Sequence, residues 1–214
     1  MEISKKDLIA LIQETEPFRN PKIDLEQYTI DAKCAIDIIY IAGVEFDDIR
    51  DQIILDFGTG TGRLSLSAAL FNPKKVISVD IDINALKILR KNVNLLNLKN
   101  EIEPICADIS QFEVDISYLK DTKKITTIMN PPFGVQKKRA DRIFLTKAFS
   151  LSDVIYSIHV DNEKVTKFIS RFAMKHGWRV DFIFPFNMVL VRSFWFHTKK
   201  RKAIDVNLFR FIKI

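Results

Sequence analysis

Short apolar segments alternate with amphipathic segments along most of the chain. β-Branched and other apolar residues dominate the first kind, which predicts strands at 52–57, 75–79, 102–107, 125–129 and 154–159. The second kind has apolar residues at helical spacing, which predicts helices at 62–70, 83–96, 140–149 and 163–176. Such alternation is typical of βαβ units. The pattern therefore predicts an α/β fold, with a mostly parallel sheet and helices on both faces.

The C-terminal part of the chain breaks this alternation. Segments 178–184 and 188–196 are strand-like, and 203–214 alternates apolar and polar residues almost perfectly. Strands that follow one another without a helix between them pair in antiparallel fashion. We therefore expect an antiparallel hairpin to close the sheet and bring it to seven strands.

The N-terminal part is helical and irregular. An amphipathic stretch at 8–12 is interrupted by Pro17 and Pro21, and a second helix is predicted at 31–42, where apolar residues share one face. We expect residues 1–50 to form a helical extension packed on a single compact domain at 51–214. A chain of this length can bury a core without a disulfide or metal.

Composition narrows the class of protein. Of 214 residues, 47% are hydrophobic and 28% charged, a balance typical of globular proteins. Cys34 and Cys106 both lie among apolar residues, and no Cys or His spacing fits a metal site. We expect two buried thiols in a cytoplasmic protein without a bound metal. No apolar run approaches the roughly 20 residues of a membrane helix, so no membrane association is expected.

Charge permits a polyanionic partner. Basic residues outnumber acidic ones by 33 to 27, which gives a net charge of +6. Two clusters stand out, and their members are Lys137, Lys138, Arg139, Lys199, Lys200, Arg201 and Lys202. Such clusters bind nucleic-acid phosphates, but they also occur in solvated loops. Charge alone leaves both interpretations open.

A glycine-rich turn follows the first predicted strand. Residues 54–62 read Ile-Leu-Asp-Phe-Gly-Thr-Gly-Thr-Gly, and glycine permits a sharp turn and the close approach of a ligand. Arg63 occupies the third glycine position of a dinucleotide fingerprint, and no P-loop Gly-Lys-Ser/Thr follows. The pattern fits S-adenosylmethionine better than NAD, although a tight structural turn also explains it. The residues assigned to the cofactor here are Asp56, Gly58, Thr59, Gly60 and Gly62.

Acidic residues end the next two predicted strands. Asp80 lies 18 positions after Gly62 and can accept hydrogen bonds from both ribose hydroxyls. Asp108 ends the third strand, where a carboxylate can accept from an adenine amino group. Asp82 lies past its strand and has the position of a helix N-cap. Because ligands of open α/β sheets bind at the carboxyl ends of the strands, these residues predict an adenosyl cofactor.

The residues that indicate the reaction are Asn130, Pro131, Pro132 and Phe133, directly after the strand at 125–129. The prolines hold the Asn130 side chain and the Pro131 carbonyl as a rigid pair of acceptors. A conjugated amino group is a poor nucleophile, and two acceptors on its hydrogens aim its lone pair at a methyl donor. Phe133 offers a face for stacking a planar base. A proline-fixed loop with a core phenylalanine is the alternative interpretation.

Together these motifs resemble the methyltransferase-like-five family, the small-subunit rRNA adenine-N6 methyltransferases. That family belongs to the class I, S-adenosylmethionine-dependent methyltransferases, which have a Rossmann-like fold. Three stretches support the resemblance: Leu-Glu-Gln-Tyr at 25–28, Asn-Pro-Pro-Phe-Gly at 130–134, and a tail in which segment 196–200 leads to segment 205–211. The resemblance covers residues 21–211. It implies methyl transfer from S-adenosylmethionine to N6 of an adenine.

The resemblance also implies positions around the cofactor. It places Gln27 and Tyr28 beside the cofactor, the glycines beneath its amino-acid end and residues 130–133 at the target base. The residues implied at its ribose and adenine are Asp80, Asp108 and Ile109. The family continues Gln-Tyr-Pro-Thr, whereas this chain has Thr29 and Ile30. Whether Thr29 replaces the contact that is missing at Ile30 stays open.

The family implies two partners. The first is rRNA, whose phosphates are expected to contact His197 and the two basic clusters. The second is a small zinc-binding methyltransferase activator protein, which forms a heterodimer with relatives by pairing with a sheet edge. Segments 48–54 and 75–79 are the expected edge elements in this chain.

Two other functions remain open from the sequence. A protein glutamine-N5 methyltransferase needs the same acceptors, although such enzymes usually carry Asn-Pro-Pro-Tyr and a larger N-terminal domain. An rRNA-binding assembly factor without turnover is the second alternative. The complete glycine turn, the two aspartates and the intact Asn-Pro-Pro-Phe motif favour an enzyme over that factor.

Overall fold

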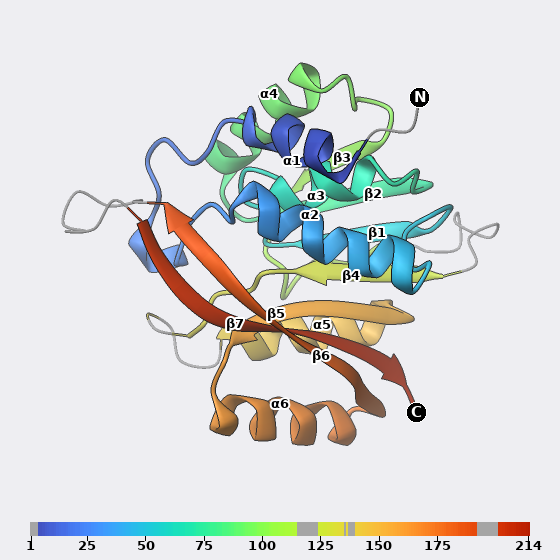
Figure 1. Ribbon diagram of the computed structural model, residues 1–214. Coiled ribbons are helices and arrows are strands. Elements are labelled where there is room, and N and C mark those ends of the chain that lie inside the picture. Colours follow the sequence, from blue (N-terminus) through green and yellow to red (C-terminus); the bar gives the residue numbers. More distant parts are fainter. Residues whose placement is uncertain (1–3, 115–123, 135, 137–139, 192–200) are drawn as a thin grey trace.

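A seven-stranded mixed sheet forms the centre of the protein (Figure 1). The computed structural model describes residues 4–114, 124–134, 136, 140–191 and 201–214, with backbone only for 190, 191, 201 and 202. The strands are β1 (Ile53–Phe57), β2 (Lys75–Asp80), β3 (Ile102–Cys106), β4 (Ile125–Met129), β5 (Val154–Val160), β6 (Trp178–Val191) and β7 (Arg201–Lys213). The helices are α1 (Lys5–Gln13), α2 (Ala32–Tyr40), α3 (Arg63–Ala69), α4 (Ile83–Leu95), α5 (Ala140–Leu151) and α6 (Glu163–Lys175), with a 3₁₀ turn, η1 (Ile23–Leu25), and a π-helical turn, η2 (Ile41–Glu45).

The strand order places the functional loops. The order is β3-β2-β1-β4-β5-β7-β6, with β1 to β5 parallel and β7 antiparallel to both of its neighbours. This confirms the mostly parallel sheet and its C-terminal antiparallel hairpin. The chain runs outward from β1 to β2 and β3, and returns to the other side of β1 with β4. A crevice at such a reversal, at the carboxyl ends of the strands, is where open α/β sheets bind ligands.

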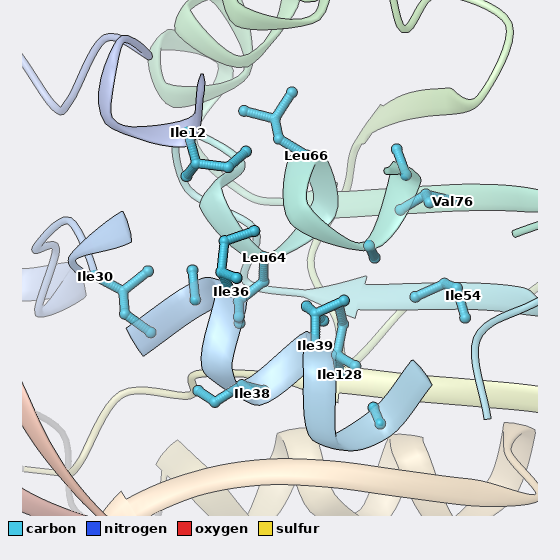
Figure 2. Close-up of a cluster of buried hydrophobic side chains, with 14 of the residues drawn as sticks. Ile12, Ile30, Ile36, Ile38, Ile39, Ile54, Leu64, Leu66, Val76 and Ile128 are labelled. Atoms are coloured by element: carbon cyan, nitrogen blue, oxygen red, sulfur yellow. The ribbon is translucent and has the colours of Figure 1, made fainter. Parts of the chain in front are cut away.

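Two apolar clusters lie on opposite faces of the sheet. On one face, Ile36 and Ile39 of α2 pack with Leu64 of α3 and Ile54 of β1 (Figure 2). The other face joins Ile53, Leu55 and Phe57 of β1 to α5 and α6. Neighbouring β1 residues serve opposite faces because strand side chains alternate. Ile12 of α1 belongs to the first cluster, and α1 packs on α2 and α3. The division of the chain at residue 50 stays a prediction.

The C-terminal hairpin differs from its prediction in one respect. Segments 178–184 and 188–196 were expected as separate strand-like pieces, but β6 runs without interruption from Trp178 to Val191, and residues 192–196 lie outside the described part. Pro185 pairs with Asn207 within this strand. Because β6 is an edge strand, the missing N–H of a proline can face outward without breaking the ladder.

The expected edge elements lie inside the sheet. Segment 75–79 belongs to β2, which pairs with both β1 and β3, and segment 48–54 leads into β1 between β2 and β4. This expectation was wrong because local pattern does not encode strand order; the edges are β3 and β6. The expected burial of Cys106 was also wrong: it ends the edge strand β3 and is exposed, whereas Cys34 is buried.

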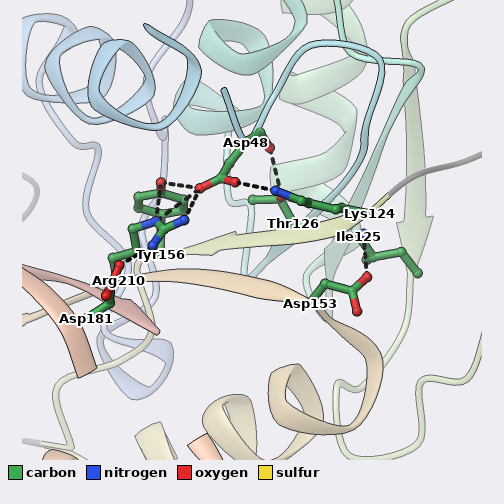
Figure 3. Close-up of polar contacts among 8 residues, drawn as sticks. All are labelled: Asp48, Lys124, Ile125, Thr126, Asp153, Tyr156, Asp181 and Arg210. Carbon is green, nitrogen blue, oxygen red and sulfur yellow. Dashed lines mark hydrogen bonds and ion pairs between the residues drawn. The ribbon is translucent and has the colours of Figure 1, made fainter. Parts of the chain in front are cut away.

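A buried polar cluster joins the segment before β1 to β5 and β7 (Figure 3). Asp48 Oδ2 accepts hydrogen bonds from Arg210 Nε at 3.0 Å, Arg210 Nη2 at 2.8 Å and the Tyr156 hydroxyl at 2.7 Å. The Asp48 carbonyl accepts from Thr126 Oγ1 of β4 at 2.7 Å. Asp48 is fully buried, so these bonds replace the water that its carboxylate loses.

None of the described helices has the length and apolar character needed to cross a membrane.

Candidate active site

A cavity of about 280 Å³ lies at the carboxyl ends of β1 to β4. Its walls come from residues 24–30, the glycine turn after β1, the ends of β2, β3 and β4, and the start of α5. The fold thus brings together, around one cavity, predicted site residues that are far apart along the chain. The cavity collects all ten residues assigned to the cofactor except Gly62.

The glycine turn needs glycine for two physical reasons. Gly60 and Gly62 have φ values of 57° and 92°, in the left-handed region that other residues rarely adopt. A Cβ on Gly60 would lie 2.7 Å from the Phe18 ring, and one on Gly62 would lie 2.2 Å from Leu89 Cδ1. The turn therefore packs its backbone directly against side chains, and Gly62 supports the turn from outside the cavity wall.

Asp56 carries an unpaired oxygen at this cavity. Its Oδ2 accepts from Thr59 Oγ1 at 2.8 Å and from Ser65 Oγ at 2.5 Å. Its Oδ1 is buried and has no hydrogen-bond partner among the described residues. Burial raises the pKa of Asp56 to about 6. A buried acceptor without a partner is costly, so this oxygen is suited to receive a donor from a ligand.

Asp80 faces the turn from the end of β2. Its Oδ2 accepts from the Gly60 backbone N–H at 2.8 Å, and its Oδ1 accepts from the Asp82 N–H at 2.8 Å. Burial raises the pKa of Asp80, and these two backbone hydrogen bonds oppose the rise. Each oxygen keeps a further acceptor position, which agrees with the predicted ribose contact. Beyond β3, exposed Asp108 accepts from the Ser110 N–H, and buried Ile109 lines the same wall.

Gln27 lines the cavity and also links two neighbouring segments of its wall by hydrogen bonds. Its Nε2 donates to Asp82 Oδ2 at 2.9 Å, and its Oε1 accepts from the Lys22 N–H at 2.8 Å. Lys22 Nζ reaches Asp82 Oδ1 at 2.8 Å. Asp82 also accepts from the Asn84 N–H, which confirms that it is the N-cap of α4. Lys22 and Gln27 are thus both anchored to Asp82, whose own N–H donates to Asp80.

Tyr28 contacts the residue predicted to be catalytic. Its hydroxyl donates to Asn130 Oδ1 at 3.0 Å, and its ring centroid lies 5.7 Å from that of Phe133. Burial raises the pKa of Tyr28 well above its usual value, so the hydroxyl stays protonated and donates. The bond holds Asn130 Oδ1 in place as an acceptor. Tyr28 was predicted beside the cofactor, and it lines the cavity as well.

Glu26 holds the same loop and was missed by the sequence analysis. Its carboxylate accepts from the Phe133 N–H at 2.7 Å and from the Gln136 N–H at 2.8 Å. Its own φ is 51°, a left-handed conformation that costs free energy in a residue other than glycine. The available signal was its place in the Leu-Glu-Gln-Tyr motif, immediately before Gln27 and Tyr28.

The four residues of the motif after β4 take different positions. Asn130 and Pro132 line the cavity, whereas Pro131 is buried and does not line it. Phe133 is half-buried and lines a neighbouring hollow of about 210 Å³ with Lys164 and Phe168. The assignment of Phe133 as a stacking surface stays a prediction.

Some predictions fall outside the described residues. These are the side chains of Lys137, Lys138, Arg139, His197, Lys199, Lys200, Arg201 and Lys202. Thr29 and Ile30 are described, buried and part of the cavity wall, and Thr29 Oγ1 accepts from the Phe18 N–H at 3.2 Å. In the described part of the chain, no three His, Cys, Asp or Glu side chains lie close enough to hold a metal ion.

Known proteins identify the family. The model of the methyltransferase small domain family matches residues 44–151. METTL5 of Danio rerio, an rRNA N(6)-adenosine-methyltransferase, is 34% identical over 96% of this chain and 97% of its own. The chain belongs to the methyltransferase small domain family. The protein MJ0284 of Methanocaldococcus jannaschii is 36% identical over 99% of this chain and 95% of its own. The solved structure of PH1948 from Pyrococcus horikoshii is 36% identical, covers both chains completely and superposes with a TM-score of 0.87.

The chain is a methyltransferase, and the residues around the cavity fit the cofactor S-adenosylmethionine. Asp80 and Ile109 offer a polar and an apolar contact to an adenosyl group, while the glycine turn permits close approach. The unpaired Asp56 Oδ1 can accept from the ammonium of the methionine moiety. These individual contacts stay predictions; the orphaned buried oxygen is the observation that supports the fit.

Proposed function

We propose that this methyltransferase methylates N6 of an adenine in small-subunit rRNA. Relatives that align over nearly the whole chain, from Danio rerio, Drosophila melanogaster and Caenorhabditis elegans, are rRNA N(6)-adenosine-methyltransferases. The site supports this reaction through Asn130, which places a hydrogen-bond acceptor at the wall of the cofactor cavity.

The adenine amino group is a weak nucleophile because its lone pair is delocalised into the ring. Asn130 Oδ1 accepts one of its two hydrogens at the cavity wall, and the Pro131 carbonyl is the predicted acceptor of the other, although Pro131 does not line the cavity itself. Two such acceptors favour a pyramidal nitrogen with a localised lone pair. The methyl group itself comes from the sulfonium centre of S-adenosylmethionine. The transferred methyl replaces one amino hydrogen, which leaves as a proton once the nitrogen carries positive charge.

The orientation of the Asn130 amide carries this proposal. The Tyr28 hydroxyl donates to Oδ1 at 3.0 Å, so the oxygen is fixed and keeps a second lone pair for the substrate. Glu26 fixes the following backbone by accepting from the Phe133 and Gln136 N–H groups. Acceptors held in place before the substrate binds need no reorganisation during the reaction.

The test is methyl transfer from tritiated S-adenosylmethionine to purified small ribosomal subunits. We expect label in rRNA, recovered after nucleoside digestion as N6-methyladenosine, and at least a hundredfold lower rate for Asn130→Ala. Asn94→Ala, on the exposed face of α4, is the matched control and should retain full activity. Label in another nucleoside, or an active Asn130→Ala protein, would contradict the proposal.

Glutamine methylation is the second candidate because of a local match. A Methanocaldococcus jannaschii protein described as an N5-glutamine methyltransferase is 31% identical over 86 residues, 40% of this chain. Treatment of the labelled products with RNase or protease separates the two substrates. Label that resists RNase and is released by protease would move the assignment to protein glutamine.

We further propose a heterodimer with a small zinc-binding methyltransferase activator protein, at work in the cytoplasm. The free edges of the described sheet, β3 and β6, offer unpaired backbone groups to such a partner. Co-expression should yield a 1:1 complex on size-exclusion chromatography. Separate elution of the two proteins at micromolar concentration would refute the heterodimer.

A further inference from the structure

Arg63 is a buried cation at the cofactor cavity that the proposed mechanism does not use. It follows Gly62 directly, begins α3, lines the cavity and is 6% exposed. Its Nε is buried and has no acceptor among the residues that the structure describes, and its Nη2 donates to the Thr15 carbonyl at 3.3 Å. Within the described part of the chain, no carboxylate oxygen lies within 4 Å of its guanidinium.

A guanidinium in this position requires an anion. Arginine remains charged in proteins, and a buried charge without a counter-ion is strongly unfavourable. Asp31 exerts an electrostatic influence on Arg63, but its two oxygens accept from the Cys34 and Val189 N–H groups at 2.9 Å each. Asp31 forms no ion pair with Arg63, so it does not supply the missing hydrogen-bonded partner.

The same cavity wall carries an unpaired group of the opposite charge. Asp56 Oδ1 is buried without a donor, and Asp56 and Arg63 form no ion pair with each other. A ligand that satisfies both must present an ammonium and a carboxylate. The methionine moiety of S-adenosylmethionine is an α-amino acid and carries this pair of charges.

We propose that Arg63 binds the α-carboxylate of the cofactor's methionine moiety and makes the enzyme select S-adenosylmethionine over its decarboxylated form. The proposal concerns the cofactor and does not depend on the methylated substrate. It also answers the departure from the family motif, because Ile30, at the position of the family's threonine, lines this cavity without a polar group.

The fold alone does not require such a carboxylate contact. A branched-chain polyamine synthase from Thermus thermophilus, 14% identical with a TM-score of 0.75, was solved with bound 5′-methylthioadenosine, which has no amino-acid group. That likeness shows only the fold. Selection for a carboxylate must therefore come from particular side chains, and Arg63 is placed to provide it.

The test compares two ligands that differ only in the carboxylate. Isothermal titration calorimetry gives the affinities of S-adenosylmethionine and decarboxylated S-adenosylmethionine for the native protein, Arg63→Met and Arg63→Lys. One charged hydrogen-bonded pair corresponds to about a tenfold to hundredfold preference for the carboxylated ligand. Arg63→Met should lose that preference while keeping its affinity for the decarboxylated ligand, and Arg63→Lys should retain part of it.

Three results would overturn the proposal. They are equal affinity of the native protein for both ligands, an equal loss of both affinities in Arg63→Met, and an unchanged preference in that variant. The second result would assign Arg63 to anchoring Thr15. If Arg63→Met does not fold, the Nε–H resonance of Arg63 in the ¹⁵N-labelled native protein decides: it should shift with S-adenosylmethionine and not with the decarboxylated ligand. Absence of label in rRNA would leave all of these affinities unaffected.

Discussion

Glu26→Gln tests whether the N-terminal segment positions the catalytic loop. The native carboxylate accepts two backbone N–H bonds, at 2.7 Å from Phe133 and 2.8 Å from Gln136. Glutamine has the same shape but one acceptor oxygen, so one of the two N–H groups must face an amide NH₂. Hydrogen bonds to charged groups contribute about 1.5–3 kcal/mol each. Because Glu26 is half-buried and Gln136 exposed, we take about 1–2 kcal/mol for the loss.

That loss predicts a methyl-transfer rate about 5- to 30-fold lower in single-turnover experiments with saturating cofactor and small ribosomal subunits. Affinity for S-adenosylmethionine should change less than threefold, because Glu26 acts on the loop after β4 rather than on Asp80. Glu103→Gln, the same chemical change on the exposed face of β3, is the matched control. A native rate for Glu26→Gln, or a loss of cofactor affinity equal to the loss of rate, would refute the positioning role.

Three further predictions concern buried ionisable side chains. Asp48→Asn removes the fully buried carboxylate that pairs with Arg210 and leaves that guanidinium with only Asp181 as a counter-charge among the described residues, so it should lower the free energy of unfolding by about 2–3 kcal/mol. Lys124→Met removes a half-exposed partner of Asp48 at 3.5 Å and should cost less than about 1 kcal/mol. Urea denaturation measures both variants, and equal effects would contradict the network in Figure 3. Burial lowers the pKa of His159 to about 3, so on acidification the unfolded state binds the proton first and the free energy of unfolding should fall by about 2 kcal/mol from pH 7 to pH 5. His159→Gln should remove this pH dependence, and identical pH profiles of unfolding for the native protein and the variant would disprove it. The pKa of Asp56, about 6, predicts about tenfold weaker cofactor binding at pH 5 than at pH 7, because only the ionised carboxylate accepts from the cofactor's ammonium. Calorimetry of Asp56→Asn should show weak binding that does not change with pH. The same pH dependence in the variant would exclude Asp56 as its source.

Local pattern predicted the elements well because each depends on neighbouring residues. The apolar alternation of β7 and the helical spacing of α4 and α6 are visible in the sequence, and Asp82 has the position of an N-cap. The break expected between residues 184 and 188 is absent because Pro185 lies in an edge strand, where a proline does not interrupt the ladder, and local pattern does not reveal strand order. The two edges were misplaced for the same reason.

The residues of the candidate site also separate into those that local sequence predicted and those that it missed. Asp56, Asp80 and Asn130 were found because each lies at, or directly after, the carboxyl end of a strand that reaches the ligand edge of the sheet. Glu26 and Arg63 were missed because their importance arises from contacts across the fold. Glu26 acts through the backbone of residues 133 and 136, more than 100 positions away. Arg63 is notable only because the fold buries its Nε without a hydrogen-bond acceptor among the described residues.

The most direct test of the account is mass spectrometry of nucleosides from small-subunit rRNA. The subunits are incubated with the protein and S-adenosylmethionine that carries a trideuterated methyl group, with and without the Asn130→Ala change. The account predicts trideuterated N6-methyladenosine with the native protein and at most about a hundredth of that amount with Asn130→Ala. Trideuterated methyl groups on another nucleoside, or equal N6-methyladenosine from both proteins, would contradict it.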